Sequence, residues 1–307
     1  MIKQFEPVRI ALQNERVVSF VQKQYLSSYQ RYFSGHEDEV ETMIKSAFSL
    51  LIESHRNYSK IHIPSLEKAT KDISRNLFHI HDDTHWFNKM HYAYKLFVRP
   101  KQDYAFIHQY LLNGNVHDFG CDGGYFSFEL LKNNHNIFLS DIVDHRIKEI
   151  NHVPFYLMKT PIDVQKMDTQ FDNGIVKTVL HHINGKYLKT VLRKLRSMHK
   201  RIIIEEDIFG IPTLLQYCSK NIIRQEAMQQ YASLDLNEQY QYNILTDFFS
   251  NAVIYNRLDI NFPFQFHTVE EWISILHEVG FTNVICKVTG FNEWKLTQNC
   301  QAWFICD

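Results

Sequence analysis

Hydrophobic positions follow a helical rhythm in the first 98 residues of the chain. Apolar side chains recur there every three or four positions, which is typical of amphipathic helices. Tyr25, Tyr29, Tyr32 and Phe33 share one such face. We interpret this tyrosine row mainly as a core stripe. The alternative is that residues 1–98 form a lid whose Tyr25 and Tyr29 face a ligand.

The pattern changes after Arg99 and Pro100. Short apolar runs bounded by Asp, Asn and Gly now alternate with helical patterns, which indicates a parallel α/β sheet. The expected strands are 115–119, 136–140, 155–158, 173–179, 201–204, 283–288 and 301–306. After the fifth of these the alternation stops, and a helical insertion is expected over about 209–261. The chain therefore divides into a helical part, 1–98, and an α/β part, 99–307.

Composition and charge argue against several classes of protein. The 33 basic and 34 acidic residues give a formal net charge of −1, so the basic excess of a nucleic-acid-binding protein is missing. The five cysteines include no C-x-x-C pair, which suits a reducing compartment. The N-terminal residues carry charges where a signal peptide needs an apolar run, and no stretch reaches membrane-spanning length, so a cytoplasmic protein is expected. The histidines and aspartates between His79 and His85 lack a recognised ligand spacing, and no metal is expected.

The most informative segment runs from Val116 to Phe126. A strand is expected to end there, glycines allow a tight turn and a close approach of the backbone to a ligand, and a helix begins. In a dinucleotide-binding fold the helix N-terminus would receive a pyrophosphate. Asp118 and Asp122 flank this turn and disfavour a polyanion, whereas acidic groups suit a ligand that carries an ammonium and a sulfonium.

This segment resembles the first motif of the class I S-adenosylmethionine-dependent methyltransferases. Residues 118–124 (DFGCDGG) are similar to the family pattern Asp-x-Gly-Cys-Gly-x-Gly, except that Asp122 replaces the middle glycine. The resemblance covers roughly residues 100–307 and implies a Rossmann-like α/β sheet with an antiparallel last strand. The helical part, 1–98, which we expect to act as a lid, lies outside the resemblance. The resemblance also implies S-adenosyl-L-methionine as the cofactor, with Asp118, Gly120, Asp122 and Gly124 beside it.

A second acid follows at a position typical of nucleotide-binding folds. Asp141 lies 23 residues beyond the aspartate of the first motif, at the end of the second expected strand. This is close to the spacing of about 20 residues for an acid that binds ribose hydroxyls. Ile142, the next residue, is placed at the cofactor too. Asp144 is the competing candidate, and we interpret it as a turn residue.

The fourth and fifth expected strands extend the resemblance. Residues 171–183 are similar to the family's Phe-Asp, strand and Leu-His-His motif, and 202–207 to a fifth strand that ends in acids. The resemblance places Lys177 of the fourth strand at the cofactor. Upstream, Asp163 is the candidate for the acid that reads the adenine edge, with residue 159 or 160 as the alternative.

The candidate catalytic residues follow from the chemistry of methyl transfer. The reaction is an in-line displacement that gains from a positioned nucleophile and a dry site, and a base helps where the acceptor is a hydroxyl or an amine. His181 leaves the fourth strand at the ligand-binding edge and is the expected base, whereas His182 is expected to pack. Glu206 and Tyr125 are further catalytic candidates, and Asp207 is a candidate for substrate binding.

The expected activity is methylation of a small-molecule O- or N-nucleophile. The alternative is a non-methylating enzyme similar to azetidine-carboxylate synthases, which would attack the aminobutyryl arm of the cofactor and release methylthioadenosine. A binding module without catalysis is a third hypothesis, in which Asp118 and Asp141 would still hold the cofactor. A small molecule is the expected partner, and no oligomeric state follows from the sequence.

Overall fold

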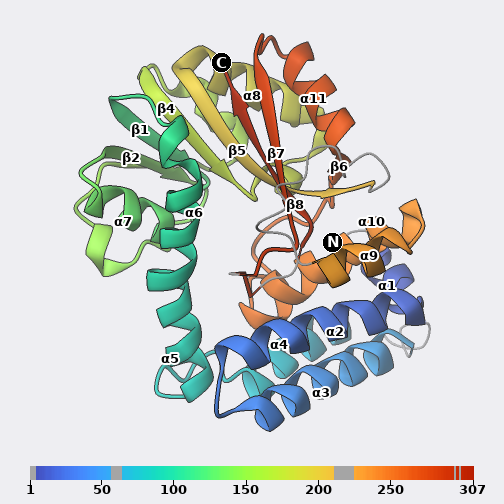
Figure 1. Ribbon diagram of the computed structural model, residues 1–307. Coiled ribbons are helices and arrows are strands. Elements are labelled where there is room, and N and C mark those ends of the chain that lie inside the picture. The colour runs from blue at the N-terminus through green and yellow to red at the C-terminus, as the bar shows by residue number, and fades with distance from the viewer. Residues whose placement is uncertain (1–4, 57–63, 211–224, 294, 297–298) are drawn as a thin grey trace.

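The computed structural model describes residues 5–56, 64–210, 225–293, 295–296 and 299–307. A layer of helices and an α/β layer lie one above the other, and a long helical column connects them at one side (Figure 1). The two parts correspond to the helical and α/β patterns of the sequence. No helix among these residues is long and apolar enough to cross a membrane.

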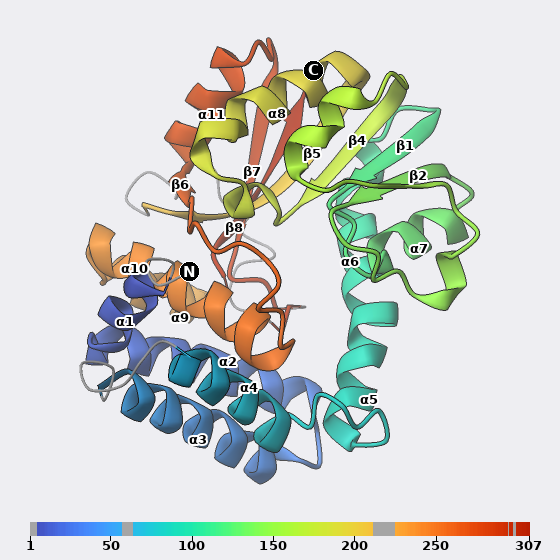
Figure 2. The same ribbon diagram turned by 180° about the vertical axis from the view of Figure 1, so that it is seen from behind.

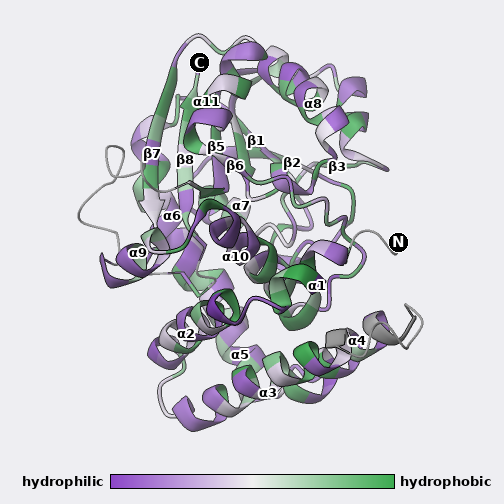
Figure 3. Ribbon diagram, turned by 90° about the vertical axis from the view of Figure 1, so that its right-hand side faces the viewer, coloured by the Kyte–Doolittle hydropathy of each residue, from purple (hydrophilic) through white to green (hydrophobic). Residues whose placement is uncertain are grey.

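The N-terminal helices form most of the helical layer. They are α1 (Glu6–Leu12), α2 (Glu15–Tyr32), α3 (Glu37–Arg56) and α4 (Pro64–Leu77). The side chain of Asn14 caps α2 by accepting a hydrogen bond from the Val17 amide, which satisfies one of the free donors of the first turn. Hydrophobic and hydrophilic residues alternate along α2 and α3 (Figure 3), as the helical periodicity predicts.

The helical column runs without a break through the expected boundary between residues 98 and 99. It consists of α5 (Trp86–Ala93), a π-helical turn (Tyr94–Val98) and α6 (Arg99–Ile107). Proline lacks an amide hydrogen and normally ends or kinks a helix, but the π turn before it rearranges the hydrogen-bonding pattern of the helix. Pro100 therefore lies at the start of α6 and the column continues.

The α/β part contains one mixed sheet in the order β3-β2-β1-β4-β5-β8-β7, in which β8 is antiparallel to both neighbours and β6 pairs with β5. The expected antiparallel last strand is confirmed. The strands are β1 (Asn115–Phe119), β2 (Asn136–Asp141), β3 (Phe155–Leu157), β4 (Phe171–Lys177), β5 (His199–Phe209), β6 (His267–Thr268), β7 (Val284–Gly290) and β8 (Gln301–Cys306). The helices among them are α7 (Tyr125–Lys132), α8 (Gly185–Met198) and α11 (Val269–Glu278), with short 3-10 turns at His108–Tyr110, Lys148–Ile150, Pro161–Lys166 and Leu180–His182.

Successive strand residues point to opposite faces of the sheet, and both faces are covered. Ile203 packs in one cluster with residues of α6 and α7, whereas Ile202 and Ile204 pack in another with residues of α8 and α11. Figure 1 shows α6 in front of the sheet, and Figure 2 shows α8 on the opposite side. Since both faces are buried, the carboxyl edge of the sheet is where a ligand has access.

The helical insertion completes the helical layer. Among its described residues are α9 (Gln225–Ala232), α10 (Leu236–Phe248) and a π-helical segment (Phe249–Ile254), while residues 211–224 lie outside the described part. Rings from the insertion meet rings of the N-terminal segment: the ring centre of Phe248 lies 5.7 Å from that of Phe5, just before α1, and the ring centre of Phe249 lies 4.9 Å from that of Tyr25 on α2. The two segments, far apart in sequence, therefore share one core.

Candidate active site

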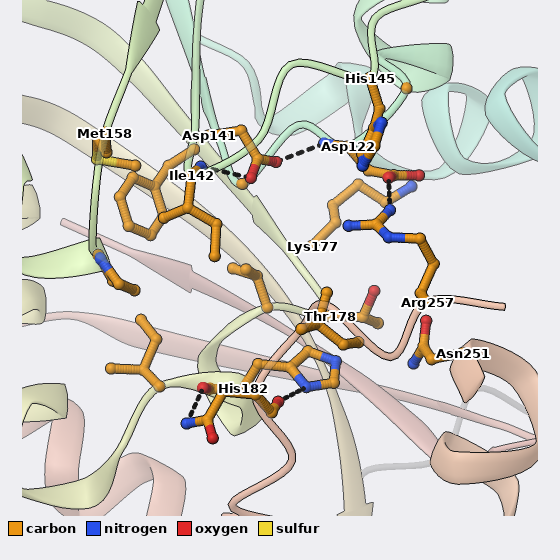
Figure 4. Close-up of a pocket in the computed structure, with 18 of the residues that line it drawn as sticks. Asp122, Asp141, Ile142, His145, Met158, Lys177, Thr178, His182, Asn251 and Arg257 are labelled. Atoms are coloured by element: carbon orange, nitrogen blue, oxygen red, sulfur yellow. Dashed lines mark hydrogen bonds and ion pairs between the residues drawn. The ribbon is translucent and has the colours of Figure 1, made fainter. Parts of the chain in front are cut away.

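A cavity of about 620 Å³ lies at the carboxyl ends of β1, β2 and β4. On the α/β side it is lined by the glycine loop, the end of β2 and the segments after β3 and β4 (Figure 4). On the other side it is lined by Lys95 and Arg99 of the helical column and by five residues between 251 and 261. A site of this size, bounded by both layers, suits a cofactor together with a small molecule.

The glycine loop turns the chain from β1 into α7. Gly120 and Gly124 have φ angles of +73° and +70°, and a Cβ on Gly124 would lie 2.0 Å from the Cδ1 atom of Ile150. Asp122 stands in the place of the family's middle glycine and has a φ of +48°, a conformation that aspartate adopts more readily than most residues. Its carboxylate accepts a hydrogen bond of 2.6 Å from Arg257. Gly120 and Asp122 line the cavity, whereas Gly124 faces Ile150.

Asp118 lies beneath the loop rather than on the cavity wall. It is buried, and its Oδ2 atom accepts a hydrogen bond of 2.5 Å from the Ser127 hydroxyl on α7. Burial raises the pKa of Asp118 to about 6, against the opposing effect of this hydrogen bond. The structure thus places Asp118 where it links β1 to α7, without direct access to the cavity.

Asp141 and Ile142, at the end of β2, line the cavity. Oδ1 of Asp141 accepts hydrogen bonds from the amides of Ile142 (2.6 Å) and Val143 (3.3 Å), and Oδ2 accepts one from the Asp122 amide (2.7 Å). A carboxylate has about four acceptor positions, so Oδ2 keeps one for a ligand. Asp144 pairs instead with an arginine two residues later and does not line the cavity.

The segment after β3 presents Met158, Thr160 and Ile162 to the cavity. Asp163, the expected adenine-reading acid, is directed elsewhere. Its carboxylate accepts hydrogen bonds from the amides of Lys159 (3.1 Å) and Thr160 (2.9 Å), as the capping box of a short 3-10 helix. The alternative position at Thr160 is the one that reaches the cavity. Asp163 does not face the cavity because its carboxylate satisfies free backbone donors at the start of this 3-10 helix.

Lys177 lines the cavity at the end of β4, beside a group of buried charges. Its Nζ atom binds the carboxylate of Asp103 and lies 3.7 Å from Oε2 of Glu205. The other carboxylate oxygen of Glu205 binds Lys295. The Nζ atom of Lys177 also lies 4.3 Å from the centre of the Phe126 ring. Burial lowers the pKa of Lys177, and the two acids oppose this effect. Lys177 is therefore anchored, and it contributes positive charge to the cavity wall.

The two histidines after β4 have the opposite orientation to the expected one. His181 is buried: its Nδ1 atom donates a 2.6 Å hydrogen bond to Glu206, and its Nε2 atom lies 3.5 Å from Oδ1 of Asp247. Burial favours the neutral ring, but Glu206 and Asp247 raise the pKa of His181 above its usual value. His182 is the ring that lines the cavity. The assignment of His181 to the cavity and of His182 to packing is therefore wrong by one residue.

Glu206 and Asp207 also lie away from the cavity. Glu206 is fully buried and accepts hydrogen bonds from the amides of Val179 (3.0 Å) and Leu180 (2.6 Å) as well as from His181. Asp207 is bound by two buried amide side chains, and burial raises its pKa to about 6. Glu206 thus holds the turn that carries the histidines, and neither acid lines the cavity.

Of the tyrosines expected at the site, one lines the cavity. Tyr125, the first residue of α7, does so, and its ring lies 4.5 Å from the ammonium of Lys95. Tyr25 and Tyr29 are fully buried within the helical layer. The Tyr25 hydroxyl donates to the carbonyl oxygen of Thr246 (3.0 Å), and the Tyr29 ring stacks on Phe87 at 5.9 Å. Tyr25, Tyr29 and Phe33 are buried, which confirms the core interpretation for these residues, and the alternative that Tyr25 and Tyr29 face a ligand is wrong.

Comparisons with known proteins find similarity among solved structures only. No protein-family model matches the sequence, and no curated protein matches it. A methyltransferase from Archaeoglobus fulgidus that is dependent on S-adenosylmethionine aligns at 14% identity over 71% of this chain and 98% of its own, with a TM-score of 0.42. Magnesium protoporphyrin IX methyltransferase from Synechocystis, with S-adenosylhomocysteine bound, aligns at 14% over 78% and 97%, with a TM-score of 0.43. The 1,6-didemethyltoxoflavin-N1-methyltransferase from Burkholderia thailandensis aligns at 16% over 80% and 90%, with a TM-score of 0.42.

The strand order assigns the fold independently of these matches. The distinguishing feature of the sheet is the antiparallel β8, which is inserted between β5 and β7 at the end of a row of parallel strands. The glycine loop after β1 and Asp141 at the end of β2 line the cavity at the carboxyl edge of that sheet. The fold is that of the class I methyltransferases.

Several cavity residues of this methyltransferase fold are absent from the sequence-based prediction. They are Lys95 and Arg99 on the helical column, and Asn251, Tyr255 and Arg257 in and after the insertion. Burial alone would raise the pKa of Asp122, but Lys95, 3.8 Å from its carboxylate, and Arg257 keep this pKa below its usual value. These residues belong to segments without a local motif. The one local signal for the cationic residues among them is Asp122, because a carboxylate where the family motif has glycine calls for a cationic partner.

Proposed function

We propose that this chain is an S-adenosylmethionine-dependent methyltransferase that acts on an O- or N-nucleophile of a small molecule. The observation that carries the proposal is the convergence of the glycine loop, the free acceptor position of Asp141 and an apolar slot on one cavity. Each of these features suits a different part of the cofactor.

The nucleoside part of the cofactor fits the α/β wall. The free acceptor position of Asp141 suits a ribose hydroxyl, which is a donor. Ile142, Met158 and Ile162 supply apolar surface for the faces of the adenine ring, and the Thr160 hydroxyl and neighbouring backbone supply polar groups for its edge.

The methionine part of the cofactor carries an ammonium and a carboxylate, and the cavity offers partners for both. Gly120 allows a close approach of the backbone, and the Asp122 carboxylate suits the ammonium. Lys95 and Arg99 suit the carboxylate. Within the described residues, the buried Nε atom of Arg99 has no hydrogen-bond partner, and its guanidinium lies 3.6 and 3.9 Å from two carboxylate oxygens.

The acceptor is expected on the remaining wall, next to His182, Asn251 and Tyr255. The bound cofactor would supply an electrophilic methyl group. The residues of this chain would hold the acceptor in line with it and exclude water, and these two effects account for much of the rate in such displacements. His182 is the ring of the Leu-His-His step that contacts this space.

Calorimetry with S-adenosylhomocysteine tests the proposal. Asp141→Asn removes one carboxylate oxygen, and the loss of a charged hydrogen bond should weaken binding by about 1.5–3 kcal/mol, or roughly 10- to 150-fold. Asp144→Asn is the matched control, because Asp144 lies three residues away and outside the cavity. Melting curves of both variants show whether the loop is retained. Equal affinity of wild type and Asp141→Asn would contradict this placement of the cofactor.

Mass spectrometry of the products separates methyl transfer from the alternative use of the cofactor. S-adenosylhomocysteine and a methylated acceptor are expected after incubation with candidate O- and N-nucleophiles. Release of methylthioadenosine would indicate attack on the aminobutyryl arm instead, as in the azetidine-carboxylate-synthase-like alternative.

A further inference from the structure

Three side chains that could bind a metal ion, from two distant segments, meet next to the acceptor side of the cavity, which His182 lines. His181 and His182 follow β4, and Asp247 lies near the end of α10 in the insertion. The Nε2 atoms of both histidines lie 3.5 Å from the same oxygen, Oδ1 of Asp247, and all three potential ligand atoms lie within 4.8 Å of one another. We propose that His181, His182 and Asp247 bind one divalent transition-metal ion.

The other ring nitrogens support this orientation. Nδ1 of His182 lies 3.0 Å from the carbonyl oxygen of Asn261, which only accepts hydrogen bonds, so this nitrogen carries the hydrogen. Nδ1 of His181 donates to Glu206, whose other oxygen accepts two backbone amides. Metal-binding histidines commonly donate their second nitrogen to a carboxylate or a backbone carbonyl in this way. Both Nε2 lone pairs are thereby available on the side of Asp247.

Asp247 contributes an independent observation. Its Oδ1 atom accepts a 2.7 Å hydrogen bond from Asn251, but its Oδ2 atom is buried and has no hydrogen-bond partner within the described residues. A buried carboxylate oxygen without a partner is costly. A cation between Asp247 and the two rings would compensate the negative charge of the Asp247 carboxylate. It would also separate Oδ1 of Asp247 from the lone pair of His182 Nε2, which lies 3.5 Å away.

The donor set indicates the kind of metal. Two imidazole nitrogens and one carboxylate oxygen suit Zn²⁺, Co²⁺, Fe²⁺ or Mn²⁺, whereas Mg²⁺ and Ca²⁺ prefer oxygen ligands only. With bonds of about 2.0–2.1 Å, neighbouring ligands of a tetrahedral ion stand roughly 3.4 Å apart, close to the 3.5 Å found here. Three protein ligands leave a position for water or substrate, as in catalytic sites.

The site would act on the acceptor of the proposed methyl transfer. His182 lines the cavity, and so does Asn251, which donates a hydrogen bond to Asp247, so an ion held by His182 would lie next to the cavity (Figure 4). An acceptor hydroxyl bound to this ion would lose its proton more readily, as metal-bound water does. This consequence rests on the proposed function, but the existence of the site does not. Metal binding can therefore be tested without cofactor or acceptor.

The test uses the untagged full-length protein, stripped with a chelator and titrated with Co²⁺. We expect one equivalent to bind, with the intense visible absorption of four- or five-coordinate cobalt. His182→Ala and Asp247→Asn should each weaken binding by about 100-fold or more. Glu206→Gln removes the carboxylate partner of His181 but keeps an oxygen for the amides of Val179 and Leu180, and it should weaken binding by about 10- to 100-fold. His145→Ala is the matched control, because His145 lines the cavity outside this group and should leave the spectrum unchanged.

Either of two results would overturn the proposal. Cobalt that binds with unchanged affinity to Asp247→Asn, or a spectrum that stays that of the hydrated ion in wild type, would show that no such site exists. His181 would then be a protonated ring that bridges Glu206 and Asp247. Melting curves of the variants separate loss of ligands from loss of the fold.

Discussion

Replacing Asp118 by asparagine should change how the stability of the protein depends on pH. Burial raises the pKa of this carboxyl group from 3.8 to about 6 in the folded chain. The native state therefore holds a proton that the unfolded state releases between about pH 4 and 6, so the free energy of unfolding falls as the pH rises through this range. A shift of about two units corresponds to roughly 3 kcal/mol. The penalty is absent below about pH 4 and complete above about pH 6.

The variant Asp118→Asn keeps an oxygen that can accept the Ser127 hydrogen bond, but it carries no charge. Its stability relative to wild type should therefore rise by up to about 3 kcal/mol between about pH 4 and pH 7. Urea unfolding at a series of pH values measures this difference. Asp172→Asn is the control: the hydrogen bond from Lys200 lowers the pKa of Asp172, so the stability difference between this variant and wild type should change only below about pH 4 and stay constant between about pH 4 and pH 7. Parallel stability curves for wild type and Asp118→Asn would refute the reasoning. A large loss of S-adenosylhomocysteine affinity would instead show that Asp118 contacts the cofactor.

Three further predictions concern the cavity and its walls. His182→Ala should lower turnover by about 10²–10⁴-fold with little change in cofactor affinity, which steady-state kinetics measure. His181→Ala should mainly lower stability, by about 3–5 kcal/mol for a broken buried ion pair, which melting curves show. The two effects would be exchanged if His181 faced the acceptor. Gly124→Ala should destabilise the protein by at least about 1–2 kcal/mol because of its positive φ, measurable by urea unfolding, and an unchanged midpoint would contradict this. Hydrogen exchange should slow across residues 251–261 when cofactor binds, but not across 15–32, since only the first of these segments contributes residues to the cavity wall. Protection of 15–32 alone would contradict this assignment of the wall.

The sequence predicted the strands well where local pattern and tertiary structure agree. Residues 115–119 and 301–306 form strands with the predicted bounds. The fifth strand, predicted as 201–204 from the hydrophobic pattern and as 202–207 from the family resemblance, extends over His199–Phe209. Its residues beyond 204 include Glu205, which a hydrophobic pattern excludes from a buried strand. Its charge is accommodated because Lys295, nearly a hundred positions later in the chain, binds it. Such long-range compensation has no local signal.

The wall of the cavity proposed for the cofactor has a local signal in the sequence, whereas the wall proposed for the acceptor depends on long-range packing. The glycine loop and Asp141 stand at a spacing typical of nucleotide-binding folds, and Gly120, Asp122 and Asp141 line the cavity, whereas Asp118 and Gly124 of the same loop do not. The wall proposed for the acceptor combines His182, which follows β4, with Asn251 and Tyr255 from the insertion. These residues come together only through the packing of the insertion, which no spacing along the chain reveals.

The reversed histidines show why a period of two cannot be extended beyond a strand. β4 ends at Lys177, and Thr178 has a φ of +51°, so the alternation of side chains stops there. The next residues form a 3-10 turn, which Glu206 holds by accepting the amides of Val179 and Leu180. Glu206 also draws His181 into the core, and the following ring is left to face the cavity. The histidine that faces the cavity is therefore selected by a buried acid on the neighbouring strand, and not by the strand that carries the histidines.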